Sequence, residues 1–250
     1  MNKLIILLVL AGLSNTVIAK DIADNKHERL IAKILNQQVK KNNSIKSSIH
    51  SILSRYPENV DTVLTIALDR YPEKYREIIL GALAAEPVLA CDIIKNAIEA
   101  NVAPVSELVN IAIETEPAYA QEIVNTAVHY SPDDIENIVR VAIRTEPFDI
   151  GNIVTNTATN YPTKMLNILT AAISAIPEQA TNIVTRLLSL FPQDAEQVVT
   201  TAVTQSDDSH DSDIVNAAIN SGVDKSDAIA AAIAGGAKKE IFAKLDNNSN

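Results

Sequence analysis

The stretch Pro117-AYAQEIVNTAVHY-Ser131 decides the fold, because it is one copy of a fifteen-residue unit that recurs along the chain. Proline heads most copies, in steps of fifteen or thirty residues, at Pro57, Pro72, Pro87, Pro117, Pro132, Pro147, Pro162, Pro177 and Pro192. Pro104 is out of step by two residues, and Val102 holds the expected position. Such self-similarity is typical of repeat architectures, in which each unit packs on its neighbours.

Apolar residues recur at fixed positions of the unit when its proline is numbered zero. Positions three, six, seven, ten and eleven are apolar, and position ten is nearly always alanine: Ala67, Ala82, Ala97, Ala112, Ala127, Ala142, Ala172 and Ala202. This spacing makes one stripe along an α-helix and does not fit the alternation of a strand. We therefore predict one helix per unit, with the stripe facing the core.

Chain geometry predicts how the helices follow one another. Proline is tolerated in the first helical turn and disfavours a helical residue before it, so each proline should begin one helix and end its predecessor. About eleven helical residues advance about 16 Å, whereas the remaining four span at most about 14 Å. Four residues are too short to lead the chain back to the end at which the helix began, so neighbouring helices should run antiparallel. The predicted fold is all-α, an α-solenoid with about 15 residues per helix-turn unit and 30 per hairpin.

The chain divides into four expected segments: a signal peptide (1–19), a basic N-terminal helix with a degenerate capping repeat (20–56), the proline-headed repeats (57–205), and an acidic loop with atypical C-terminal repeats and a frayed tail (206–250). The basic helix should run from about Asp24 to Lys40, and Ser44 should cap the short helix that follows. After the repeats we expect a polar acidic insertion (Gln205–Asp213), an Ala-rich helix (Ala228–Ala234) and a short basic helix to Leu245.

The first nineteen residues have the pattern of a secretory signal peptide. Lys3 precedes an apolar stretch from Leu4 to Leu13, and Val17 and Ala19 are the small residues expected before a cleavage point. We expect cleavage after Ala19 and an exported protein, periplasmic or extracellular. The apolar stretch is too short to span a membrane comfortably, and no other segment is apolar enough, so we predict no membrane span.

Charge is distributed unevenly along the chain. Residues 20–56 carry eight Lys or Arg against three Asp or Glu, a net charge of +5. From Pro57 onward there are twelve against twenty-eight, a net charge of −16. The acidic part repels phosphate groups, which disfavours nucleic acid as a partner.

Residues that carry catalysis or bind metals are sparse. His27, His50, His129 and His210 are far apart in sequence, and no phosphate-binding, zinc or redox motif occurs, so we predict no cofactor and no enzyme. An exported hydrolase, the opposing hypothesis, would need these histidines clustered with carboxylates. Asp207, Ser209 and Asp211 have the oxygen spacing of a calcium loop. However, Ser212 replaces its glycine and Ala218 its closing glutamate, so a solvated loop is preferred.

Position five of the unit is polar in every repeat. Because alternate units should stack, one row is expected to contain Glu77, Glu107, Asn137, Asn167 and Gln197. Such a row of carboxylates and amides could bind an extended chain or a basic segment. It could equally be the solvated back of each helix, because position five adjoins the core stripe without belonging to it.

The repeats resemble α-helical solenoids of the tetratricopeptide or HEAT-like kind over roughly residues 42–234. They lack the Trp, Gly and Tyr positions of the tetratricopeptide motif, and their hairpin is shorter, so no functional residue is carried over. The resemblance implies a rigid surface for protein or peptide contact.

Our first hypothesis is an exported, non-enzymatic scaffold that binds a protein or peptide, including a basic one. The alternative is a self-assembling envelope or matrix protein whose basic arm, with Lys40, Lys41 and Lys46, docks on the acidic solenoid.

Overall fold

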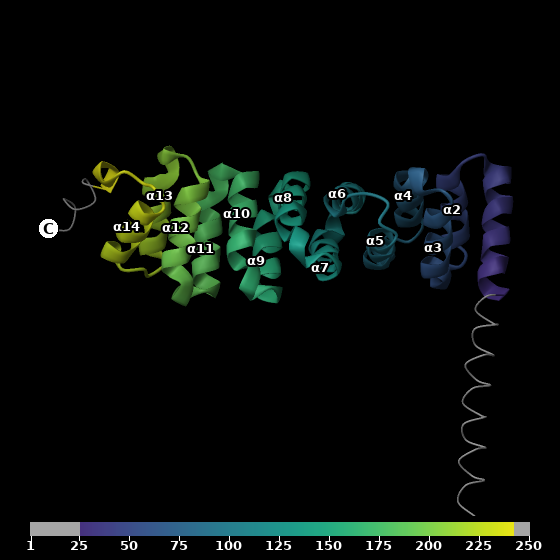
Figure 1. Cartoon of the computed structure of the whole chain (residues 1–250), viewed down its shortest axis with the longest axis horizontal. Helices are drawn as coiled ribbons and strands as arrows, with labels where there is room; N and C mark the ends of the chain where they lie inside the picture. Colours follow the sequence, from purple (N-terminus) through teal and green to yellow (C-terminus); the bar gives the residue numbers. More distant parts are fainter. Residues whose placement is uncertain (1–25, 243–250) are drawn as a thin grey trace, which may run out of the picture. The chain divides into compact units, whose positions relative to one another are not determined.

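A computed structural model describes residues 26–242, and within this range all regular structure is helical (Figure 1). An N-terminal helix covers residues 26–42. The helices that follow are α2 (Ile45–Leu53), α3 (Val60–Arg70), α4 (Tyr75–Ala85), α5 (Ala90–Glu99), α6 (Val105–Thr115), α7 (Ala120–Tyr130), α8 (Ile135–Thr145), α9 (Ile150–Asn160), α10 (Met165–Ala175), α11 (Ala180–Leu190), α12 (Ala195–Gln205), α13 (Asp211–Asn220) and α14 (Lys225–Ala234). The predicted all-α repeat solenoid is confirmed. The expected signal peptide and C-terminal tail lie outside the described residues.

Each repeat proline begins a 3₁₀ turn, and not the α-helix itself as the sequence predicted. In the quoted unit the turn is Pro117–Tyr119, and α7 starts three residues after the proline. Glu116 makes the bend with φ −133° and ψ 70°. Its N–H still donates to the Ala112 carbonyl (2.8 Å), and its own carbonyl accepts from the Tyr119 N–H (3.1 Å). The backbone groups around the bend are thereby satisfied without glycine.

The predicted apolar stripe forms the core. Ile123, Val124 and Ala127 are all 0% exposed, and the alanine column is equally buried in the other repeats that carry it. Thr157 replaces alanine in α9, and its buried hydroxyl has no hydrogen-bond partner among the described residues. Alanine suits this column because a side chain of one carbon lets neighbouring helices approach closely.

Within each of two groups of helices, α2–α5 and α6–α14, the helices pack in two layers. Each helix contacts the next helix and the next but one of its own group, as α6 contacts α8 and α7 contacts α9. Figure 1 shows α6, α8 and α10 in one layer and α7, α9 and α11 in the other. Contacts between alternate helices therefore join residues about thirty positions apart. The antiparallel order of the helices stays a prediction from chain length.

The described residues form two compact units, 26–102 (the N-terminal unit) and 103–242 (the C-terminal unit). The boundary coincides with the slip in the proline spacing. There α5 ends at Glu99, Asn101 has a φ of 51°, and Pro104 caps α6 without a preceding 3₁₀ turn. A positive φ in a residue other than glycine is uncommon and marks a sharp local change of chain direction.

The predicted acidic insertion after Gln205 is wrong, because these residues form the head of another repeat. Asp208 begins a 3₁₀ turn, Asp208–His210, and α13 starts at Asp211. Numbered from Asp208, the buried Ile214, Val215 and Ala218 fall on core positions six, seven and ten. Asp208 lies one residue after the position that the fifteen-residue spacing, counted from Pro192, predicts for the next head. The head has no proline, so the sequence pattern alone did not reveal it.

The last helices also differ from the prediction. The Ala-rich helix α14 begins at Lys225, three residues earlier than expected, because Asp224 caps it by accepting from the Ser226 N–H (2.8 Å). Gly222 precedes it with a φ of +98°, a conformation that side chains rarely adopt. A 3₁₀ turn, Lys239–Phe242, follows where a basic helix was expected, and the rest of that segment lies outside the described residues.

Candidate functional site

The position-five row is largely engaged within the protein. Glu77 forms an ion pair with Lys74 in its own turn (3.1 Å). Asn137 donates to Asp134 (2.6 Å) and accepts from Arg140 (2.9 Å). Of the other members, Glu107 is half-buried on α6 and Gln197 is exposed on α12.

Asn167, the remaining member of the row, links two helices. Its amide donates to Glu136 across the contact between α10 and α8 (2.7 Å). Through Asn167 the row helps to hold neighbouring repeats together. An amide engaged in this hydrogen bond would have to give it up in order to bind an external chain.

Polar links between alternate helices were missed at the sequence level. Asn96 donates to Asp61 (2.6 Å), joining α5 to α3. The Thr145 hydroxyl donates to Asn110 (2.8 Å), joining α8 to α6. Asn125 donates to Asn156 (2.6 Å), joining α7 to α9. The partners are 31 to 35 residues apart in sequence. Only the expectation that units thirty residues apart stack on one another could have predicted these pairs.

Two of the three residues of the suggested calcium loop lie in helical structure. Asp207 precedes the 3₁₀ turn, Ser209 lies within it, and Asp211 is the first residue of α13. Asp208 binds the Lys238 ammonium group (2.6 Å), and this pairing lowers the pKa of Asp208. Among residues 26–242 no group of three or more His, Cys, Asp or Glu side chains is arranged to hold a metal ion.

Asp211 is only 2% exposed. Burial, helped by the nearby negative charge of Asp208, raises the pKa of Asp211 above its ordinary value of about 3.9. The folded state therefore binds a proton here more readily than the unfolded state does. Stability from this group is greatest at low pH and falls as pH rises through the raised pKa.

Asp211→Asn is expected to stabilise the protein at neutral pH, because it removes a charge that burial disfavours. The gain in the urea midpoint should shrink as pH falls from the raised pKa of the folded state toward about 4, and it should vanish at lower pH, where the wild-type carboxyl is protonated in both states. Asp213→Asn removes the same charge from an exposed position in the same helical turn and should give no such gain. A gain for Asp211→Asn that does not depend on pH would contradict the electrostatic explanation.

The four histidines lie on different elements. His27 is in the N-terminal helix and bonds Asn59 (2.8 Å), and His50 is in α2. His129 packs edge-on against Tyr130 in α7, and His210 ends the turn before α13. His27 and His50 belong to the N-terminal unit, and His129 and His210 belong to the C-terminal unit.

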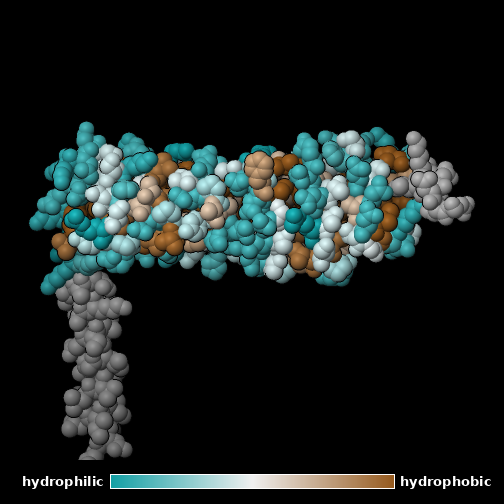
Figure 2. Space-filling view, turned by 180° about the vertical axis from the view of Figure 1, so that it is seen from behind, coloured by the Kyte–Doolittle hydropathy of each residue, from teal (hydrophilic) through white to brown (hydrophobic). Residues whose placement is uncertain are grey.

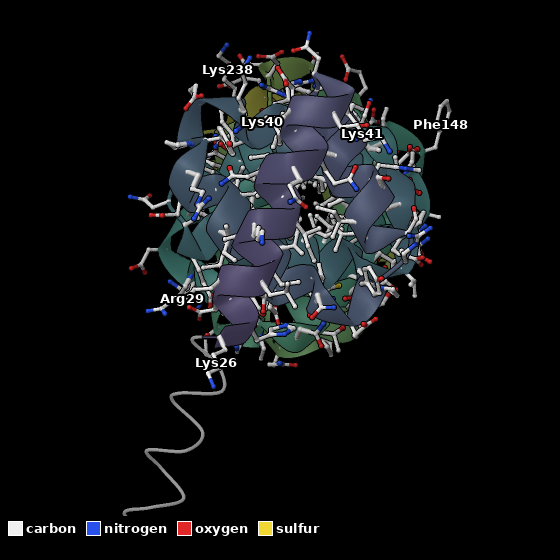
Figure 3. The ribbon with its side chains drawn as sticks, turned by 90° about the vertical axis from the view of Figure 1, so that its right-hand side faces the viewer. Lys26, Arg29, Lys40, Lys41, Phe148 and Lys238 are labelled. Carbon is white, nitrogen blue, oxygen red and sulfur yellow. The ribbon has the colours of Figure 1, made fainter. Side chains whose placement is uncertain are left out.

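The three lysines proposed for self-association do not share one surface. Lys40 lines a groove with Arg29, Lys33 and Arg70. Lys46 lines a separate hollow with His50. Figure 3 shows Lys41 on the other side of the N-terminal helix from Lys40 and Arg29.

The groove lined by Lys40, which we call the cationic groove, has a volume of about 390 Å³. Arg29, Lys33 and Lys40 follow one face of the N-terminal helix, since their spacings of four and seven residues return to the same side. Arg70, the last residue of α3, completes it. The helical spacing of the first three could have been read from the sequence, whereas Arg70 joins them only through tertiary packing.

Two hydrogen bonds hold the N-terminal helix beside the helices that follow it. Tyr71, directly after α3, donates its hydroxyl to Asn36 (3.4 Å), which itself lines the groove. His27 bonds Asn59, at the start of α3 (2.8 Å). Buried Ile31 and Leu35 lie on the opposite side of the helix and anchor it in the core.

The four cations of the groove have no carboxylate partner among the described residues. All four side chains are exposed. Like charges held around one hollow repel one another, and an anionic group placed there would relieve that repulsion. The groove is therefore suited to an acidic ligand.

Exposed apolar side chains are scattered. Figure 2 shows a mostly hydrophilic face with small, separated hydrophobic areas. Phe148 is 98% exposed in the turn before α9, and Val88 is 66% exposed in the corresponding turn before α5. Single exposed apolar residues are normal on soluble surfaces and define no binding patch.

Among residues 26–242, no helix combines the length and apolar character that a membrane crossing requires.

Comparisons of the chain with known protein families, curated proteins and solved structures found no match.

Proposed function

We propose that the protein is an exported, non-enzymatic helical-repeat scaffold that binds an acidic segment of a partner protein in the cationic groove. The observation that carries this proposal is the set of four unpaired cations, Arg29, Lys33, Lys40 and Arg70, around one hollow. Export rests on the signal-peptide pattern of residues 1–19. This acidic partner differs from the basic segment that the row of carboxylates and amides at position five suggested.

A protein segment fits the groove better than a compact small molecule does. The groove is open and lined by long, flexible side chains and by the amides of Asn36 and Gln37. Apart from Ala32, its lining residues all carry polar or charged groups, whereas mostly apolar side chains usually enclose small ligands. Multiple carboxylates along a chain could meet several cations at once, which gives specificity and fast association.

A second candidate function, self-assembly, is favoured by the charge distribution. Residues 26–56 carry seven Lys or Arg against one Asp or Glu, whereas residues 103–242 carry seven against nineteen. The acidic partner segment could therefore belong to another copy of this chain. Such a head-to-tail contact is heterologous and would produce rings or filaments.

Charge reversal in the groove should strongly weaken binding to an acidic peptide. The double variant Lys33→Glu/Lys40→Glu is expected to bind fluorescein-labelled poly-glutamate at least about tenfold more weakly, because it replaces two attractive contacts by repulsion. Fluorescence anisotropy at several salt concentrations measures the affinity. Binding of the wild type should weaken as salt rises.

The matched control is Lys41→Glu/Lys46→Glu, which changes net charge equally but leaves the groove intact. It should lower the affinity much less. Equal losses in both variants would mean that the peptide senses only overall charge, and the groove proposal would fail.

Sedimentation at low and high salt separates the two functions. Self-assembly predicts multimers that dissociate at high salt and are absent in Lys33→Glu/Lys40→Glu. A monomer at every salt concentration would exclude self-assembly and leave the binding of a different partner as the function.

A further inference from the structure

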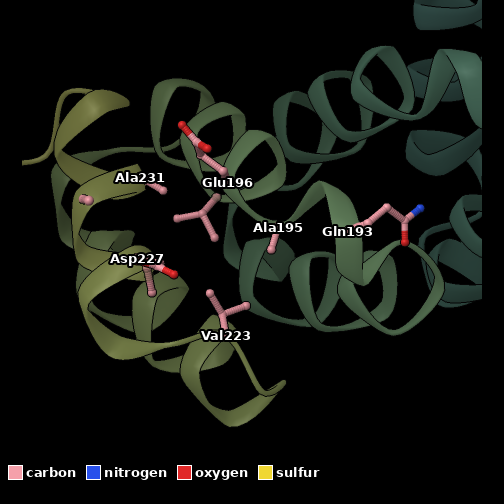
Figure 4. Close-up of a pocket in the computed structure, with 9 residues that line it drawn as sticks. Gln193, Ala195, Glu196, Val223, Asp227 and Ala231 are labelled. Carbon is pink, nitrogen blue, oxygen red and sulfur yellow. The ribbon is translucent and has the colours of Figure 1, made fainter.

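A cavity of about 330 Å³ lies between α12 and α14, far along the sequence from the cationic groove (Figure 4). Its apolar lining includes Ala195 and Val199 of α12, Val223 of the loop before α14, and Ala231 of α14. A volume near the lower end of the range for ligand pockets limits the occupant to a small group.

The cavity exists because side-chain volume is missing at one column of the repeat. The third position after the head carries Ile135 in α8 and Met165 in α10, which are 2% and 4% exposed. The same position in α12 is Ala195. The opposite wall is also made of small residues, since α14 presents alanines there.

Two carboxylates border this apolar space from opposite helices. Glu196 comes from α12 and Asp227 from α14. In Figure 4 the Asp227 side chain points from α14 toward α12. Neither carboxylate forms an ion pair among the described residues. An apolar hollow with two unpaired negative charges at its border is complementary to a short alkyl chain that ends in a positive charge.

We propose that this cavity binds an aliphatic primary ammonium group, with its alkyl chain on the alanine and valine surface and its nitrogen at Asp227. An ammonium group can donate to this carboxylate, and the negative charge of Glu196 at the border adds to the attraction. Anions are repelled by the carboxylates, and a neutral alcohol of the same length leaves them unneutralised. The group could be a free alkylamine or the side chain of a lysine.

Nuclear magnetic resonance of the full chain with labelled alanine methyl groups tests this directly. Titration with n-pentylamine at physiological salt should shift the signals of Ala195, Ala228 and Ala231 in a saturable way, because these alanines line the cavity. The alcohol n-pentanol should shift them much less. Comparing n-pentylamine with Nα-acetyl-lysine amide distinguishes the two sources, since a site for a protein lysine should bind the lysine derivative at least equally well.

Three variants and one control variant complete the test. Asp227→Asn should weaken n-pentylamine binding about tenfold, as expected for losing a hydrogen bond between charged groups, and Glu196→Gln should weaken it less, because it removes only a nearby charge. Ala195→Met should fill the cavity and block binding while the protein stays folded. Glu178→Gln removes an exposed carboxylate outside the cavity and should change nothing. Unsaturable shifts spread over the whole acidic surface, or equal losses in all the charge variants, would overturn the proposal.

Discussion

Replacing Ile138 by aspartate is expected to unfold the centre of the C-terminal unit, with a loss of more than about 4 kcal/mol. Ile138 is 0% exposed at core position six of α8. A charged carboxylate there has no partner, and burying it costs several kcal/mol beyond the lost apolar contacts. Because α8 packs against α6, α7, α9 and α10, the damage should extend to several repeats.

Urea denaturation followed by circular dichroism measures this effect, and two controls define its cause. Ile138→Val should cost only about 0.5–1.5 kcal/mol, since it removes one methylene group. Thr163→Asp introduces the same charge at an exposed position in the turn before α10 and should change stability by less than about 0.5 kcal/mol. A denaturation curve of Ile138→Asp like that of the wild type would refute the register of the repeats.

Gly81→Ala is expected to destabilise the N-terminal unit, although alanine normally favours a helix over glycine by about 1 kcal/mol. A β-carbon at Gly81 in α4 would lie 2.5 Å from the Lys46 carbonyl oxygen and 3.1 Å from the Lys46 Cα. These are backbone atoms of α2 and cannot rotate away. Overpacking of this kind costs about 1–3 kcal/mol, so the net effect should be a lower melting temperature.

Gly151→Ala is the matched control, because its new β-carbon would meet only the end of a flexible side chain. The nearest atom is the Arg186 Cζ at 2.5 Å. Arg186 can move outward at the cost of its exposed hydrogen bond to Asn182. We expect a result between neutral and about 1 kcal/mol more stable. If both glycine variants behaved alike, close approach of α2 and α4 would not be the reason for Gly81.

The candidate surfaces were less predictable than the fold. The position-five row was visible in the sequence, but its use was not, because Asn167 bonds Glu136 on another helix. The cationic groove needs Arg70 beside a helix that ends at residue 42, and no local pattern connects them. The α12–α14 cavity depends on small residues that face each other across two helices.

The sequence by itself determined the helices, their spacing and their buried face. A helix places every third or fourth residue on one side, so the stripe through Ile123, Val124 and Ala127 had one interpretation, and proline restricts the backbone whatever surrounds it. Only the tertiary structure decided which residues meet, because contacts between alternate helices join positions about thirty residues apart. It also decided that the repeat continues after Gln205: Asp208 heads a unit without proline, and the burial of Ile214 and Val215 places the helix of that unit against the core.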